Sequence, residues 1–261
     1  MQCETIVCKV VLGHVFPLCG MLTNLFILLA PWKVVQQTLK TKQTGTISTI
    51  PYVFLMMNSL TWVIYGFAIK DYYVTIPNLQ GYLIANYYNF TTFPYLSESR
   101  QYLTINLILS FLSLIFIGGI VDFIVFNNDT TGRLILGSIC LFILSLFYLS
   151  PLSEILNIIR TKNCASINPK LAFAVVINSA LWCSYGSLLG DWFIIGPNGF
   201  GFLLGLFQVF LLIVYPSTLE KEAMPINADL ELKGSASGDT QSIDPLETEH
   251  HREDMIISIN K

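Results

Sequence analysis

The chain is short of charge. Asp, Glu, Lys and Arg make up 12% of its 261 residues, about half the usual fraction of a soluble domain, whereas hydrophobic residues make up 53%. Charged side chains are missing from seven windows: 10–32, 43–69, 72–97, 101–121, 134–153, 171–190 and 192–219. Each window has the ~20 residues that a helix needs to cross a bilayer. Because lipid offers the backbone no hydrogen-bond partner, and because β-barrel strands are much shorter, these windows predict seven transmembrane helices.

Motifs of catalysis and metal binding are also missing. The sequence holds no metal-ligand cluster, no nucleophile–base pair and no phosphate-binding loop, so we expect no metal, no cofactor and no enzyme activity. Its six cysteines form no C-x-x-C pair, and we expect buried, inert thiols, with a Cys3–Cys8 disulfide as the alternative. The net charge of −3 comes largely from the C-terminal residues, so no nucleic-acid partner is expected.

Lys and Arg in the short loops predict the orientation of the chain. Seven lie on one side of the predicted bundle and three on the other: Lys33, Lys40, Lys42, Arg100, Arg160, Lys162 and Lys170 against Lys9, Lys70 and Arg133. Since cytoplasmic loops carry the positive excess, we expect the N-terminus outside and the C-terminus in the cytoplasm. Residues 217–261 are rich in Glu, Asp, Ser and Thr, and predict a disordered acidic tail. The plasma membrane is the default location, with the Golgi or another endomembrane as the alternative.

What the chain does contain is an internal repeat. Residues 31–78 and 151–198 match without a gap at 12 of 48 positions, where composition alone gives roughly three. The matches in the first copy are Pro31, Thr41, Lys42, Ile47, Asn58, Ser59, Trp62, Tyr65, Gly66, Asp71, Pro77 and Asn78, each repeated 120 residues later. Polar, aromatic and helix-breaking residues are kept, while the apolar residues between them differ. Duplicated units of this kind are how many transporters build a binding site near the middle of the membrane.

The repeat also predicts the fold. The chain crosses the membrane four times between Pro31 and Pro151, so the two copies have the same orientation. We therefore predict an all-α membrane protein with seven transmembrane helices, arranged as two parallel three-helix bundles joined by an inverting linker helix (3+1+3). The predicted parts are 1–95 for the first repeat, 96–130 for the linker helix and outer loop, 131–216 for the second repeat and 217–261 for the tail.

Two pairs of polar residues within the helices are candidates for a binding site. Asn78 and Asn198 must face protein, water or ligand, because an unpaired amide in hydrocarbon costs on the order of several kcal/mol. A hydrogen bond between helices is the alternative role, but two symmetry-related amides supply donors and acceptors suited to sugar hydroxyls. Trp62 and Trp182 lie well inside their windows, where an indole can cover the apolar face of a sugar ring; an interfacial anchor is the alternative.

The motifs resemble those of the SWEET family of sugar transporters, for which parallel repeats are known. The first copy carries a Pro, a basic Lys-Thr-Lys loop, then Asn-x-x-x-Trp-x-x-Tyr-Gly and Pro-Asn: Pro31, Lys40-Thr41-Lys42, Asn58…Trp62…Tyr65-Gly66 and Pro77-Asn78. The second copy carries Pro151, Arg160-Thr161-Lys162, Asn178…Trp182…Tyr185-Gly186 and Pro197-Asn198. The resemblance covers roughly residues 10–216. A single motif would be weak evidence, but two in register on a seven-helix pattern are strong.

This resemblance implies roles for the matched residues. It implies that substrate is bound by Asn78, Asn198, Trp62 and Trp182, and that Asn58 and Asn178, one helical turn before each Trp, line the pocket or join helices. It implies an extracellular gate of Tyr65, Tyr185, Asp71 and Asp191, for which an interfacial Tyr and a solvated Asp are the alternative. It also implies a tetrad of flexing prolines inside helices, Pro31, Pro51, Pro151 and Pro169, although Pro169 could simply begin its helix.

Titratable residues within the predicted membrane region are few. His14 and Asp122 are the candidates for a proton relay, and Asp122 lies near the outer end of the linker helix. Because the repeats place no charged residue in the presumed pocket, we expect passive, bidirectional facilitated diffusion of mono- or disaccharides by alternating access. Asn128 begins a glycosylation sequon in the predicted outer loop, whereas the sequon at Asn89 lies in or near the membrane and is expected to be unused.

Two other functions compete with sugar transport. An amino-acid transporter of the PQ-loop type has a similar architecture, but the dipeptides here are Pro31-Trp32 and Pro151-Leu152 rather than Pro-Gln. A seven-helix receptor fits the helix number but has no need of an internal repeat. The expected partners are a small sugar and the lipid bilayer, and the family resemblance implies homo-oligomers.

Overall fold

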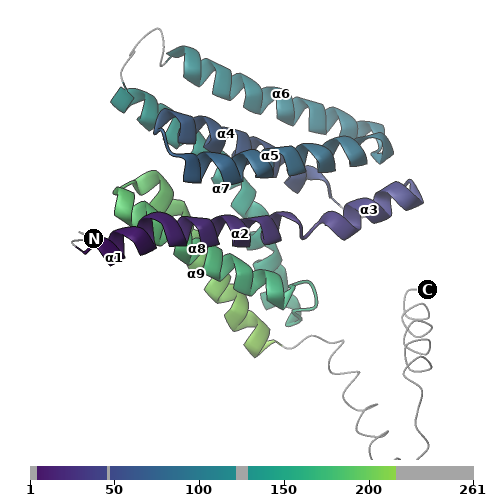
Figure 1. The fold of residues 1–261 in the computed structure, drawn as a ribbon. Coiled ribbons are helices and arrows are strands. Elements are labelled where there is room, and N and C mark those ends of the chain that lie inside the picture. The colour runs from purple at the N-terminus through teal and green to yellow at the C-terminus, as the bar shows by residue number, and fades with distance from the viewer. Residues whose placement is uncertain (1–4, 46–47, 122–128, 216–261) are drawn as a thin grey trace, which may run out of the picture. The chain divides into compact units, whose positions relative to one another are not determined.

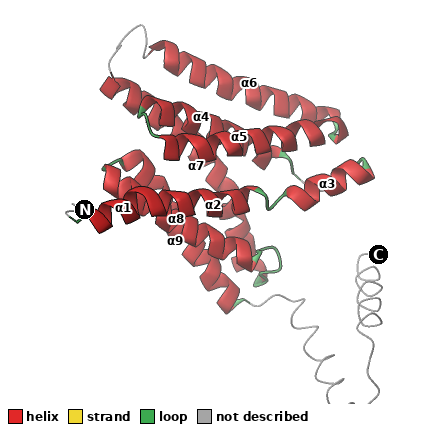
Figure 2. Ribbon diagram, viewed as in Figure 1, coloured by secondary structure: helices red, strands yellow, loops and turns green. Residues whose placement is uncertain are grey.

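The computed structural model describes residues 5–45, 48–121 and 129–215, and these residues are helical apart from short loops, with no strand among them (Figure 2). The helices are α1 (Ile6–Val10), the π-helical η1 (Val11–Val15), α2 (Phe16–Leu28), α3 (Trp32–Thr41), α4 (Ile50–Ala68), α5 (Tyr72–Thr92), the 3-10 turn η2 (Phe93–Tyr95), α6 (Glu98–Val121), α7 (Asp129–Thr161), α8 (Pro169–Leu189) and α9 (Trp192–Val214). The segments α1, η1 and α2 correspond to the first predicted window, 10–32, and α3 extends beyond it, so the first candidate span runs from Ile6 to Thr41. Helices α4 to α9 correspond to the other six windows.

Six of these described segments are long and apolar enough to cross a membrane, and α5 is the exception. With 21 residues α5 has the required length, but it carries several Asn, Thr and Tyr side chains. Two of them are buried and bonded inside the protein: Asn89 Nδ2 donates to the carbonyls of Tyr52 and Ala85, and Tyr88 Oη donates to Leu28 O at 2.9 Å. Neighbouring helices therefore supply partners for these two polar side chains of α5, and the sequon at Asn89 lies in the protein interior.

The helices pack in a pattern that repeats. Within each repeat, α5 packs along α4, and α9 packs along α8. Between the repeats, α2 packs on α8 and α7 packs on α4, so each repeat contributes the same two surfaces. Helix α6 contacts α4 and α7 and lies at the top of Figure 1, away from α8 and α9. This arrangement is the predicted 3+1+3 fold, in which α6 joins two similarly oriented three-helix bundles.

The prolines of the predicted tetrad correct one expectation. Only Pro151 lies inside a helix, because α7 continues through it. The chain turns at Leu29–Pro31 and Pro31 caps α3, Pro51 is the second residue of α4, and Pro169 is the first residue of α8. Since the first helical turn needs no partner for its N–H groups, proline fits there without breaking a bond. Interior prolines are found instead at Pro77 in α5 and Pro197 in α9.

Several other expectations concern the cysteines and the residues outside the described ranges. Cys140 and Cys164 are buried free thiols, as expected, whereas the free thiols of Cys19 and Cys183 are exposed and half-buried. Cys8 is disulfide-bonded, and its predicted partner Cys3 lies outside the described residues. The same is true of Asp122, of the glycosylation candidate Asn128 and of the predicted tail 217–261.

Candidate functional site

A cavity of about 490 Å³ lies between the two repeats, a size typical of sites for small molecules. All six residues predicted to bind substrate line this cavity: Asn58, Trp62, Asn78, Asn178, Trp182 and Asn198. They come from α4 and α5 in the first repeat and from α8 and α9 in the second. We call this cavity the chamber.

The amides of Asn78 and Asn198 are held in the same way. Each follows an interior proline, and each Nδ2 donates to the carbonyl four residues earlier, at 2.8 Å from Val74 O and 2.8 Å from Ile194 O. Both residues are only partly buried, and neither Oδ1 has a hydrogen-bond partner among the described residues. Each amide is therefore fixed by its own helix and keeps an acceptor and one donor for a ligand in the chamber.

The indoles of Trp62 and Trp182 lie toward one end of the chamber. Each is 8% exposed and meets the tyrosine one turn further along its own helix edge-on, with ring centroids 5.5 Å apart for Trp62–Tyr65 and 6.0 Å apart for Trp182–Tyr185. A methyl group on Gly20 would lie 2.9 Å from Trp182 Nε1, so the glycine allows α2 to approach the indole closely. The indoles thus link the wall of the chamber to the tyrosines beyond it.

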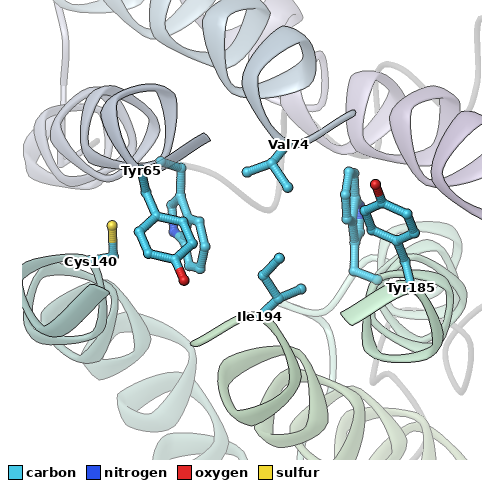
Figure 3. Packing of buried hydrophobic residues seen from close by; sticks show 7 residues of the cluster. Tyr65, Val74, Cys140, Tyr185 and Ile194 are labelled. Carbon is cyan, nitrogen blue, oxygen red and sulfur yellow. The ribbon is translucent and has the colours of Figure 1, made fainter. Parts of the chain in front are cut away.

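Two reciprocal hydrogen bonds close this end of the chamber. Tyr65 Oη donates to Asp191 Oδ2 at 2.7 Å, and Tyr185 Oη donates to Asp71 Oδ2 at 2.6 Å, so each bond joins one repeat to the other. Figure 3 shows Val74 and Ile194 pointing toward one another between the two tyrosines. Both aliphatic side chains are 2% exposed, and both tyrosines are buried. We call Tyr65, Asp71, Tyr185 and Asp191 the Tyr–Asp gate, after the role that the family resemblance implies, and both of its hydrogen bonds are formed in this structure.

The same aspartates also begin the next helices. Asp71 Oδ1 accepts from the backbone N–H of Tyr73 and Val74, and Asp191 Oδ1 accepts from that of Phe193. Each carboxylate therefore uses one oxygen as an N-cap and the other as the acceptor of the gate tyrosine. A methyl group on Gly66 would lie 2.5 Å from Thr75 Oγ1, which explains the glycine after the tyrosine in this motif.

Asn58 and Asn178 line equivalent parts of the chamber but differ in their bonding. Asn178 Oδ1 accepts from Thr23 Oγ1 at 2.9 Å. Asn58 Oδ1 is buried and has no partner among the described residues. The residue 120 positions after Thr23 is Ile143, which is fully buried and offers no donor. The first repeat thus presents an unpaired acceptor where the second presents a bonded one.

Of the other predicted residues, some line the chamber and others lie outside it. Pro51 and Pro151 line the chamber, whereas Pro31 and Pro169 do not. His14 Nδ1 lies 2.8 Å from Tyr73 Oη, beside the Tyr–Asp gate rather than in the chamber, since Tyr73 packs edge-on against Tyr185.

The structure corrects the expectation of an uncharged chamber. Glu154, one helical turn after Pro151, is partly buried and lines the cavity. Polar side chains that the sequence analysis did not single out line it as well, among them Asn24, Tyr148, Ser150, Asn168 and Gln208. Tyr148 Oη donates to the carbonyl of Pro197 at 3.0 Å. The chamber is therefore a polar, mostly neutral cavity with one carboxylate in its wall.

The described part of the chain holds no candidate metal site, because no three His, Cys, Asp or Glu side chains come close enough to hold an ion.

In the loop between α7 and α8, burial raises the pKa of the Cys164 thiol, and the nearby Glu154 carboxylate raises it further. The Cys164 thiol donates to Leu211 O at 3.2 Å, so it has a structural place in the core.

Comparison with known proteins agrees with this geometry. The family described as "Sugar efflux transporter for intercellular exchange" matches residues 14–101 and 134–220, which contain the two repeats. The bidirectional sugar transporter SWEET10 of Arabidopsis thaliana is 29% identical over 226 residues, covering 85% of this chain and 78% of its own length. The bidirectional sugar transporter N3 of Medicago truncatula is 28% identical, covering 80% and 79% respectively.

An animal protein and a solved structure are similar too. The sugar transporter SWEET1 of Danio rerio is 29% identical over 171 residues, which cover 66% of this chain and 77% of that protein. The 3.7 Å structure of a eukaryotic SWEET transporter superposes with a TM-score of 0.73 at 24% identity, covering 80% of this chain and 98% of the other. The two chains share the same fold.

Proposed function

Because the chain belongs to the SWEET family of sugar efflux transporters, we propose that it carries neutral mono- or disaccharides in both directions by facilitated diffusion. Family membership makes it a multi-pass membrane protein and a transporter rather than an enzyme. The observation that carries the proposal is a chamber between the repeats with Asn78, Asn198, Trp62 and Trp182 in its wall. Paired amides suit the hydroxyl groups of a sugar, and indoles suit the apolar face of its ring.

Transport follows from alternating access to this chamber. The two Tyr–Asp hydrogen bonds hold one end shut, so this conformation serves substrate from the opposite end. Breaking both bonds and rocking the repeats apart would open the gate, while the other end closes behind the substrate. The reciprocal geometry supports this mechanism, because a relative movement of the repeats strains both bonds at once.

We place the Tyr–Asp gate on the outer side of the plasma membrane, with the N-terminus outside, the tail in the cytoplasm and homo-oligomeric assembly as the family resemblance implies. The excess of Lys and Arg in the loops at the other end supports this orientation. It predicts that Asn128 in the outer loop carries a glycan. A gel shift that glycosidase removes from the wild type and that Asn128→Gln lacks would support this orientation. Cleavage of the loop around Asn128 by a protease present only in the cytoplasm would refute it.

The site assignment is tested by removing both amides. In cells that lack sugar uptake, the double variant Asn78→Ala, Asn198→Ala should lose labelled-glucose flux by roughly 10- to 100-fold, because each lost hydrogen bond is worth about 0.5–1.5 kcal/mol. Asn86→Ala is the matched control: its Nδ2 makes the same bond to the carbonyl four residues earlier, but it does not line the chamber. Intact flux in the double variant would remove these residues from the site.

The passive character needs a separate measurement. We expect labelled glucose in vesicles to reach the outside concentration and no more, with or without a pH difference. Uphill accumulation driven by an imposed pH difference would contradict facilitated diffusion and would point to Glu154 as a coupling group.

A further inference from the structure

Glu154 gives the chamber a charge that has no counterpart at the equivalent position of the first repeat. It lies on α7, one turn after Pro151, and its counterpart 120 residues earlier is the apolar Val34. Among the described residues that line the chamber it is the one charged side chain, since no Lys, Arg or Asp lines it. Glu154 also makes no hydrogen bond or ion pair within the described ranges, so its charge is not cancelled by a neighbour.

The position of Glu154 is away from the Tyr–Asp gate. Its neighbours in the chamber wall include Ser150 on the same helix, and Ser166 and Asn168 in the loop that leads into α8. No Tyr–carboxylate pair closes this end within the described residues. A sugar that enters here therefore passes the carboxylate before it reaches the amides of Asn78 and Asn198.

We propose that Glu154 selects substrates by charge, favouring neutral and cationic sugars and excluding sugar phosphates from the chamber. This inference rests on the proposed transport of sugars. A phosphate monoester carries about −1.5 to −2 charges at neutral pH, and a fixed carboxylate in a cavity with low-dielectric walls repels it while leaving neutral hydroxyl groups unaffected. The Asn and Trp pairs cannot make this distinction, because they are uncharged.

The charge field can be measured without any sugar. Ser150→Cys, one turn from Glu154, is introduced into a protein in which Cys19 and Cys183 are changed to Ser. The rates at which the new thiol reacts with a cationic and an anionic methanethiosulfonate are then compared. We expect the cation to react faster by roughly tenfold relative to the anion, from two charge units at about 6 Å in water. Glu154→Gln should remove most of this preference, and Glu154→Lys should reverse it.

Glu98→Gln is the matched control, because it makes the same charge change on the exposed start of α6 and does not line the chamber. In the purified protein, Glu154→Gln should make glucose 6-phosphate compete several-fold better against labelled glucose and glucosamine compete worse, each relative to unlabelled glucose in the same variant. An unchanged reagent ratio in Glu154→Gln, or an equal change in Glu98→Gln, overturns the proposal. A wild-type protein that binds no glucose would instead overturn the transport function, while the reagent ratio still decides the role of Glu154.

Discussion

At the gated end of the chamber, Tyr65, Asp71 and Val74 of the first repeat have direct counterparts in Tyr185, Asp191 and Ile194. At the other end, equivalent positions carry different residues with different roles. Tyr88 is fully buried and donates to Leu28 O, whereas its counterpart Gln208 lines the chamber.

The difference has a physical cause in packing. In the first repeat, Val35, Tyr52 and Tyr88 form a buried cluster, and Trp32 stacks on Tyr87 with ring centroids 5.3 Å apart. The counterparts of Tyr52 and Tyr88 in the second repeat are Ala172 and Gln208, and both line the chamber. Smaller and polar residues leave the space that the aromatic cluster fills on the other side. The chamber therefore extends toward the second repeat at this end.

This comparison indicates which parts of a duplicated transporter can diverge. In the proposed mechanism both repeats move together at the gate, and its two bonds are reciprocal, so a change in one copy would unbalance the other. The wall of the chamber has no such requirement. Glu154 opposite Val34 and Gln208 opposite Tyr88 are differences in the chamber wall that leave the four gate residues unchanged, and under our proposal the first of them sets selectivity by charge.

The largest effect that would test this comparison is on stability. Tyr88→Ala should lower the free energy of unfolding by about 3–5 kcal/mol, because it leaves a cavity and unpairs Leu28 O. Gln208→Ala should cost less than about 1 kcal/mol, because this side chain already faces the chamber. Denaturant unfolding of the purified protein measures both. Tyr102→Ala, at a residue 67% exposed on α6, controls for the loss of a tyrosine; equal costs at 88 and 208 would contradict the packing difference.

The gate should instead respond alike in the two repeats. Tyr65→Phe and Tyr185→Phe each remove one hydrogen bond to a carboxylate, worth about 1.5–3 kcal/mol, so each should raise the open-gate population by roughly 10- to 100-fold. The native Cys140 thiol, which is fully buried beside Tyr65 (Figure 3), reports the opening through its rate of modification by a membrane-impermeant reagent.

Tyr73→Phe serves as the control for the gate variants, since the hydroxyl that it removes lies against His14 Nδ1 and bonds to no gate carboxylate, while the ring and the backbone N–H are kept. Both variants are compared in the background with Cys19 and Cys183 changed to Ser. A large effect at one tyrosine and none at the other would mean that one bond alone holds the gate shut.

Much of this arrangement could be predicted from the sequence. The 120-residue offset paired Asn78 with Asn198 and Trp62 with Trp182, and the structure brings all four into one chamber. The repeat is informative because a polar residue is costly in a membrane helix, so one that both copies contain is expected to have the same role in each. Helical periodicity could have extended the site, since Tyr148, Pro151 and Glu154 follow one another at spacings of three on one face of α7.

Other features could not be read from the repeat, because it reports only what the two copies share. Glu154 and Gln208 are residues of one copy, so a search for matches passes over them. The prolines are a related case: the sequence predicted Pro51 inside a helix and left a helix start as the alternative for Pro169, and only the backbone shows that both lie at helix starts. The unpaired acceptor of Asn58 depends on Ile143 from another helix, which no local pattern reveals.

The smallest expected effect concerns this acceptor. Asn58→Leu removes a buried oxygen that has no partner, whereas Asn178→Leu removes one that Thr23 satisfies. A buried acceptor without a partner costs about 1–3 kcal/mol, whereas Asn178→Leu leaves Thr23 Oγ1 its bonds to the carbonyls of Cys19 and Gly20, so Asn58→Leu should be the more stable variant by about 1–3 kcal/mol. Thermal unfolding of the purified protein gives this difference, and both variants should bind glucose more weakly than the wild type does.

Thr23→Val sharpens the same comparison, because it leaves Asn178 Oδ1 without its donor and makes the second repeat resemble the first. In that background the stability difference between the two leucine variants should disappear. Glucose should also raise the melting temperature of the wild type more than that of Asn58→Leu, since Asn58 lines the chamber and its Nδ2 can donate to a sugar hydroxyl. If Asn58→Leu is instead less stable than Asn178→Leu with and without Thr23, the Asn58 oxygen has a partner in solution and the two repeats are alike at this position.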